Sequence, residues 1–276
     1  MRADRVFVVG SGTVIPEAER GGTCLYARMA DRRILIDAGP GAARSLERLG
    51  LPWAEITDLI LTHFHADHVG GLPGLFFALR HGVQPPRTGE GLEVWGPPGT
   101  RRLFESLAAA LGDFFVRPGF PLRITEVKFG GGGALGARVR LATCKTAHTD
   151  ESQAIRLDSP TGSLGFTGDT GAGAIPELGP FFHEVSVLVA ECSLPDDRVG
   201  DNHLSPGSVA RLGAAAEPAV LALTHVYPET RALGDLSALV RTAGFDGTVS
   251  VVHDGWSWDL GRASADPTPG RNPAAG

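Results

Sequence analysis

The chain has 276 residues, of which 42% are hydrophobic and 20% charged, a composition typical of a globular protein with a substantial core. Its 25 basic and 31 acidic side chains give a net charge of −6, and without a long basic run this disfavours tight, sequence-independent binding of nucleic acid. Because no apolar run approaches the roughly 18 to 20 residues of a membrane span and the first residues do not resemble a signal peptide, we expect a cytoplasmic protein that does not enter a membrane.

Short runs rich in β-branched and aliphatic residues alternate with a few helical patterns along the chain. Strands are predicted at 6–9, 24–28, 33–36, 58–61, 92–95, 122–129, 137–143, 154–157, 163–166, 185–190, 220–223 and 248–252. Helices are predicted at 42–49, 72–80, 100–111, 206–216 and 230–243. So many strands need two sheets, and helices occur between strands in both halves. We therefore predict an α/β fold, a four-layer αββα sandwich of two mixed β-sheets flanked by helices.

The domain organisation is predicted to be simple. No repeat or long linker divides residues 1–261, so we expect one domain there. Residues 262–276 contain three prolines and no large apolar residue, which predicts a disordered tail. The three cysteines, Cys24, Cys144 and Cys192, are odd in number and far apart, so neither a disulfide framework nor a thiolate zinc site is expected.

A cluster of possible metal ligands follows the apolar strand at 58–61. It has the sequence His63-Phe64-His65-Ala66-Asp67-His68, with four metal-competent side chains in six residues. Packing three imidazoles and a carboxylate together is unfavourable unless a cation compensates, and this donor set suits Zn²⁺ or a similar divalent ion. Four ligands cannot complete two metal sites, so we expect partners from later strand ends, where His148, Asp169 and His225 are the candidates.

With these motifs in view, residues 5–257 resemble the hydrolases of the metallo-β-lactamase fold. The resemblance is carried by Gly10-Ser11-Gly12-Thr13, Ile36-Asp37-Ala38-Gly39, the histidine motif, Thr224-His225 and Asp254-Gly255. It implies that one metal ion is bound by His63, His65 and His148 and a second by Asp67, His68 and His225, with Asp169 and a hydroxide bridging the two.

Two divalent ions make hydrolysis the natural reaction. Metals about 3.5–4 Å apart lower the pKa of a bridging water and clamp the attacked and leaving oxygens. Zinc is the expected metal, and manganese or iron also suits the ligands. Asp67 is therefore counted among the catalytic residues as well as the ligands. Asp37, which follows a buried strand and precedes Gly39, is expected to support the site rather than to catalyse.

Within this superfamily the sequence looks most similar to the ribonuclease Z branch of phosphodiesterases. That similarity implies a catalytic pair, Glu191 and His203, in which Glu191 orients His203 to donate a proton to the leaving oxygen. In an alternative interpretation His203 only orders the loop before Ser205, a predicted helix N-cap. Branch members that process transfer RNA carry a basic, glycine-rich arm between the third histidine ligand and the bridging aspartate, whereas only residues 149–168 lie between them here.

Several functions remain open at this point. The favoured one is a phosphodiesterase for a small or cyclic phosphodiester, with hydrolysis of a lactam, lactone or thioester as the alternative and transfer-RNA 3′ processing as a further one. A non-hydrolytic metal binder or an oxygen-chemistry protein is a different class, which His65 disfavours because the related di-iron oxygen reductases have Glu at that place. A small-molecule substrate is expected, a large nucleic acid is disfavoured but left open, and a homodimer is compatible with the sequence.

The other histidines and the paired aromatic residues are expected to lie outside the site. His81, His183 and His253 have no second ligand-type neighbour at a useful spacing. The phenylalanine pairs at 76–77, 114–115 and 181–182 are predicted to belong to the core or to a pocket wall.

Overall fold

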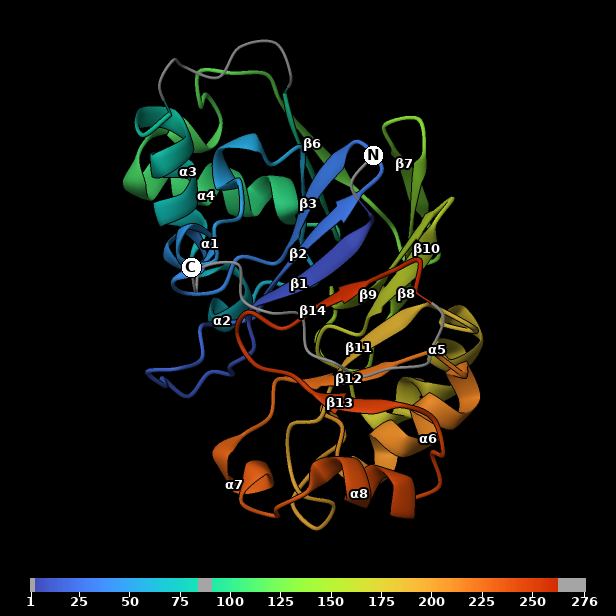
Figure 1. Cartoon of the computed structure of the whole chain (residues 1–276). Coiled ribbons are helices and arrows are strands. Elements are labelled where there is room, and N and C mark those ends of the chain that lie inside the picture. The colour runs from blue at the N-terminus through green and yellow to red at the C-terminus, as the bar shows by residue number, and fades with distance from the viewer. Residues whose placement is uncertain (1–2, 84–90, 263–276) are drawn as a thin grey trace.

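The fold is described by a computed structural model that covers residues 3–83 and 91–262. In these residues the chain forms two mixed seven-stranded sheets packed face to face, with helices on their outer faces (Figure 1). The predicted four-layer αββα sandwich is therefore confirmed. The predicted C-terminal tail lies, except for Arg262, outside the described residues. No helix in the described ranges has both the length and the apolarity needed to cross a membrane.

The first sheet contains the strands of the N-terminal half together with one strand from the C-terminus. Its order is β14 (Ser257–Asp259), β1 (Arg5–Gly10), β2 (Cys24–Met29), β3 (Arg32–Ile36), β4 (Asp58–Ile60), β5 (Leu92–Gly96) and β6 (Leu122–Glu126). Strands β3 to β6 are parallel, whereas β14, β1, β2 and β3 pair antiparallel.

The second sheet mirrors this arrangement. Its order is β13 (Val249–Val251), β12 (Leu221–Thr224), β11 (Val187–Glu191), β10 (Gly162–Phe166), β9 (Gln153–Ser159), β8 (Val139–Lys145) and β7 (Gly132–Leu135). Strands β10 to β13 are parallel, and β7 to β10 pair antiparallel. Each sheet therefore has parallel strands whose carboxyl ends form one edge, the place where such sheets present functional groups.

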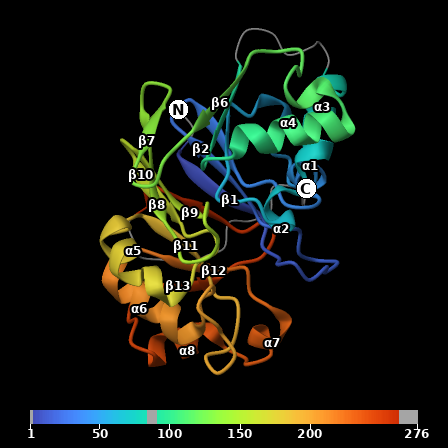
Figure 2. The same cartoon turned by 180° about the vertical axis from the view of Figure 1, so that it is seen from behind.

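The helices cover the outer faces of the sandwich (Figure 2). Helices α1 (Ala42–Arg48), α3 (Leu72–His81) and α4 (Thr100–Leu111) lie on the first sheet, and α5 (Ile175–Phe181), α6 (Pro206–Ala216) and α8 (Leu236–Thr242) lie on the second. Two four-residue α-helices, α2 (Ala66–Val69) and α7 (Pro228–Arg231), and three short 3₁₀ helices at Trp53–Glu55, Asp113–Phe115 and Ala172–Ala174 complete the set in the described residues.

Strand β3 shows why the sequence forms this sandwich. Ile34 and Ile36 belong to the buried cluster between the two sheets, whereas Leu35 packs into the cluster beneath the outer helices. Successive side chains of a strand point to opposite faces, and both faces of this sheet are covered. An uninterrupted apolar run is therefore required, in place of an alternating one.

The structure corrects several predicted elements. The helix predicted at 230–243 is wrong: α7 and α8 are separate, because Gly234 has a φ of +95° and Asp235 caps α8 by accepting a hydrogen bond from the amide of Ala238. The strand predicted at 137–143 is the second arm of a β7–β8 hairpin that turns at Gly136, and the strand predicted at 122–129 ends at Glu126. Helices α2 and α5 and strands β7 and β14 were not predicted.

Candidate metal centre

The predicted ligand motif lies at the carboxyl end of β4 and in the adjoining helix α2. His63 and His65 occupy the loop after β4, and Asp67 and His68 lie within α2. The loop is held against β3, since the amide of Ala38 donates to the carbonyl of His68 at 2.7 Å. Gly39 permits this close approach, because an added Cβ would lie 2.2 Å from the carbonyl oxygen of Asp67.

A first group of side chains combines two histidines of the motif with two residues from loops that follow strands of the second sheet. The donor atoms of His63, His65, His148 and Asp169 all lie within 4.8 Å of one another. His148 Nε2 is 3.0 Å from His65 Nδ1 and 3.7 Å from Asp169 Oδ2. The ring of His148 is fixed from behind by the carbonyl oxygen of Asn202, which is 2.8 Å from Nδ1.

A second group shares Asp169 with the first. Donor atoms of Asp67, His68, Asp169 and His225 also lie within 4.8 Å of one another. His68 Nε2 is 3.2 Å from Asp169 Oδ1, and His225 Nε2 is 3.1 Å from Asp67 Oδ2. The structure thus brings together all seven residues that the sequence singled out as ligands, in two adjoining groups with Asp169 between them.

The donor atoms fit a pair of divalent cations. The buried Nε2 atoms of His63 and His68 have no hydrogen-bond partner, although both face the carboxylate of Asp169. An unpartnered buried polar group costs about 1–3 kcal/mol, which a bound cation offsets. Burial lowers the pKa of His63 to about 2, and the neighbouring imidazole of His68 adds to this shift. His63 is therefore neutral, as a metal ligand must be.

Asp37 contacts the second group from behind, in keeping with the supporting role predicted for it. Its carboxylate lies 2.7 Å from Nδ1 of His68 and accepts hydrogen bonds from the amide and hydroxyl of Thr62 at 2.8 and 2.7 Å. A carboxylate that receives the Nδ1–H of a histidine leaves Nε2 free for a metal and raises its basicity. These contacts are the ones expected of the supporting role predicted for Asp37.

We expect Asp37→Asn to weaken metal binding about 10- to 100-fold, the usual cost of losing such a partner. The amide keeps the shape of the side chain but removes the charge that faces His68. Competition with a chromophoric chelator measures the affinity. Asp58→Asn is the matched control, because Asp58 is equally buried and pairs with Arg32 outside both groups. Equal affinity in Asp37→Asn and the unmodified protein would contradict the assignment.

The predicted pair Glu191 and His203 adjoins both groups. Nδ1 of His203 is 2.9 Å from Glu191 Oε2, and the amide of Thr170 donates to Oε1 at 2.5 Å. The ring centroid of His203 lies 4.9 Å from that of His148 and 5.9 Å from that of His225. Burial opposes protonation of His203, but the hydrogen bond and charge of Glu191 outweigh it and raise the pKa to about 8.

Two residues near this pair had no predicted role. Ser193 donates to a carboxylate oxygen of Glu191, and its Oγ also lies 3.1 Å from Nδ1 of His225. It thereby links the Glu191–His203 pair to a candidate ligand. Tyr227 packs with its ring centroid 5.9 Å from that of His225. The position of Ser193 two residues after a buried strand-end glutamate is the one sequence feature that could have indicated it.

The three histidines predicted to lie outside the site are not part of it. His81, His183 and His253 belong to none of the ligand groups in the described residues. Of the three phenylalanine pairs, Phe76, Phe115 and Phe182 are buried in the core, as expected, and Phe114 and Phe181 are partly buried, whereas Phe77 is 55% exposed.

Known proteins resemble this chain in sequence and in fold. A family model described as the metallo-beta-lactamase superfamily matches residues 19–225. An uncharacterized protein of Mycobacterium leprae is 31% identical over 272 residues, covering 93% of this chain and 88% of its own. A ribonuclease Z of Halobacterium salinarum is 26% identical, covering 95% of this chain and 99% of its own. The ribonuclease Z of Halorubrum lacusprofundi is matched over only 47% of its length.

Among solved structures, YhfI of Bacillus subtilis, a metallo-beta-lactamase fold protein, superposes with a TM-score of 0.78 at 21% identity and covers 94% of this chain and 99% of its own. At this level of identity the likeness concerns the fold alone. The sequence match over three quarters of the chain establishes more: the chain belongs to the metallo-beta-lactamase superfamily.

Proposed function

We propose that this metal-dependent hydrolase cleaves a small or cyclic phosphodiester at a dinuclear centre. The observation that carries the proposal is the pair of adjoining His/Asp groups that share Asp169, with the Glu191–His203 pair at their margin. In this scheme His63, His65 and His148 hold one ion, and Asp67, His68 and His225 hold the other. Zinc suits a set of imidazole and carboxylate donors.

The bound ions would supply Lewis-acid polarisation of a phosphoryl oxygen and activation of water near neutral pH. The protein's own residues do the remaining work. Asp37 keeps His68 in the tautomer that leaves Nε2 free. Ser193 contacts both Glu191 and His225 and so fixes the positions of these two side chains relative to each other. Glu191 accepts from Nδ1 of His203, so the proton on Nε2 is available to the leaving oxygen of the substrate.

A small substrate is favoured by the segment between His148 and Asp169. After a short turn, this segment consists of β9, a tight turn and β10, both strands paired within the second sheet. Because nearly all residues of this segment belong to the two paired strands and their turns, it is too short to form a protruding basic arm as well. The net charge of −6 also opposes a large polyanionic substrate. The ribonuclease Z relatives support a phosphodiester as the bond that is cleaved.

The test combines metal analysis with a comparison of substrates on the same sample. We expect about two metal ions per chain, turnover of bis(p-nitrophenyl) phosphate, and loss of turnover after treatment with chelator. A chromogenic lactam, a thioester and a precursor transfer RNA are assayed beside it. Turnover of the lactam or thioester alone would replace the proposal with acyl hydrolysis, and efficient cleavage of the precursor would replace it with transfer-RNA processing.

A further inference from the structure

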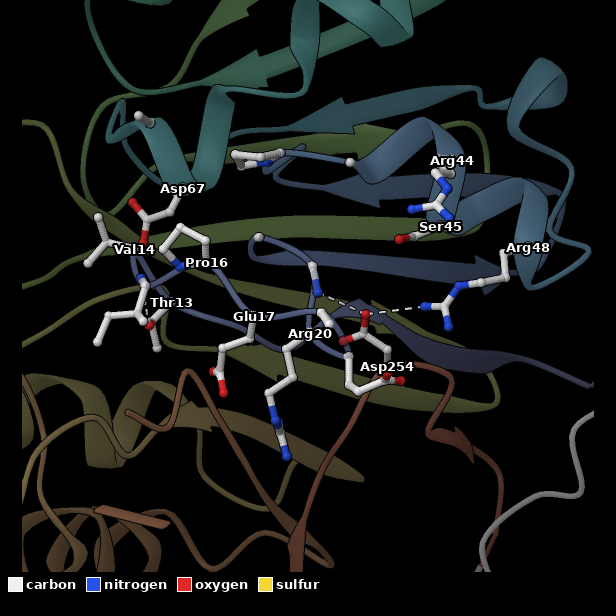
Figure 3. A pocket seen from close by; sticks show the side chains of 18 residues that line it. Thr13, Val14, Pro16, Glu17, Arg20, Arg44, Ser45, Arg48, Asp67 and Asp254 are labelled. Carbon is white, nitrogen blue, oxygen red and sulfur yellow. Dashed lines mark hydrogen bonds and ion pairs between the residues drawn. The ribbon is translucent and has the colours of Figure 1, made fainter. Parts of the chain in front are cut away.

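A cavity of about 550 Å³ lies beside the metal centre (Figure 3). Its walls are the loop at 13–22 and one face of α1, and Asp67 of the second ligand group forms part of its lining. A volume of this size is typical of sites for small organic molecules. The cavity therefore adjoins the place where the proposed reaction occurs and has room for one arm of a substrate.

Most of the charged groups in the cavity are already paired. Arg48 lies 3.3 Å from Asp254, whose carboxylate also accepts from the amide of Gly21 at 2.9 Å. Glu17 pairs with Arg231, which lies outside the cavity. These contacts hold the loop and α1 in place, and the charges that make them are already balanced by partners within the protein.

Arg44 differs from its neighbours. Its side chain is exposed in the wall of the cavity and makes no ion pair or side-chain hydrogen bond with any described residue (Figure 3). The hydroxyl of Ser45 next to it has no side-chain hydrogen bond within the described residues either. A guanidinium presents five donors in a planar fork that matches a carboxylate or phosphate. Among the acidic residues that line the cavity, Glu19 also makes no ion pair with a described residue, and its side chain is exposed on the loop.

The same cavity has an apolar side. Val14 and Ile15 line it and are 62% and 39% exposed, so both side chains are accessible to a ligand in the cavity. Together with Arg44 they offer contacts to a group that is apolar along its length and anionic at its end. His203, the proposed proton donor, is not among the residues that line the cavity.

We propose that this cavity binds the substrate arm that is not the leaving group, and that Arg44 recognises a second anionic group on that arm. The inference rests on the proposed function and specifies its substrate class: a phosphodiester in which one alcohol combines an apolar body with a terminal carboxylate or phosphate. The leaving alcohol lies on the side of His203, outside the cavity.

The test uses two p-nitrophenyl phosphodiesters, one of 6-hydroxyhexanoic acid and one of 6-hydroxyhexanamide. They have the same leaving group and length and differ in the terminal charge. We expect the metal-loaded protein to prefer the carboxylate about tenfold in kcat/KM, mainly through KM, and Arg44→Met to reduce this ratio to near one. Arg44→Lys should keep part of the preference, because it retains the charge without the fork.

Two further variants separate a specific contact from a general effect of charge. Arg211→Met removes an exposed arginine of α6 that does not line the cavity and should leave the ratio as it is. Glu19→Gln alters the cavity charge by one unit, as Arg44→Met does, but in the opposite sense. An equal and opposite change of the ratio in Glu19→Gln would overturn the inference, because the field of the cavity would then explain the preference.

The two diesters distinguish an error in the proposed function from an error in the role of Arg44. If neither diester is cleaved, the proposed function fails and the inference with it. If both are cleaved without a preference for the carboxylate, or if the preference survives Arg44→Met, the inference alone is overturned.

Discussion

Asp169→Ala is expected to lose metal from both ligand groups and, with it, nearly all turnover. The carboxylate of Asp169 is the member common to the two groups, with oxygens 3.2 Å from His68 Nε2 and 3.7 Å from both His148 Nε2 and His225 Nε2. Burial opposes its ionisation, but the imidazoles around it, His225 first, hold its pKa well below the usual range. Asp169 is therefore ionised, and the substitution removes a negative charge that both ligand groups share.

The expected loss of metal affinity exceeds about a hundredfold, the upper end of what removal of an outer hydrogen-bond partner costs. Metal content per chain and turnover are measured on the same preparation. Asp169→Asn keeps the volume of the side chain and should show nearly the same loss, which separates the missing charge from a cavity.

Asp254→Asn provides the matched control. Asp254 is also a loop aspartate with a buried side chain and several hydrogen bonds, including one from the amide of Ser11 at 2.9 Å, yet it belongs to neither ligand group. It should lose stability while keeping its metal. If Asp169→Ala retained normal metal content and activity, the assignment of the shared ligand would be wrong.

The candidate metal ligands could be predicted because each follows an apolar strand in the sequence. His63 to His68 form a dense motif directly after a buried strand, and Asp169 and His225 each follow a strand of the parallel part of the second sheet. Such strands end at one edge, so residues distant in the sequence converge there. Strand patterns and ligand chemistry together named these residues as candidates, and His148, which follows the antiparallel strand β8, was named on ligand chemistry and its place after an apolar strand alone.

Other features depend on contacts that have no local pattern. Strand β14 has three residues and exists because it pairs with β1, at the other end of the chain. Helix α2 is too short to show a helical period. The cavity beside Asp67 is formed by an irregular loop at 13–22 against one face of α1. Arg44 is distinctive only because its neighbours Arg20 and Arg48 already make hydrogen bonds or ion pairs. The spacing of apolar residues along the sequence therefore predicts neither the short elements nor the cavity.

His203→Ala should separate metal binding from proton transfer. The residue adjoins both ligand groups but is held by Glu191, so the variant should keep its metal. A positioned general acid contributes about 10²- to 10⁴-fold when the leaving oxygen needs a proton. We therefore expect turnover of phosphodiesters with alkyl leaving groups to fall by about that factor, and that of p-nitrophenyl esters to fall much less, because p-nitrophenolate departs without protonation.

The pH dependence gives an independent measure of the same role. With a pKa raised to about 8, His203 is protonated at neutral pH and loses its proton above pH 8, so turnover of alkyl esters should decline there. Glu191→Gln removes the charge that raises the pKa and should move this decline to lower pH. His183→Ala, an exposed histidine outside the site, should leave both profiles as they are. Equal slowing of alkyl and p-nitrophenyl esters in His203→Ala, with metal retained, would show that His203 orders its loop and does not donate the proton.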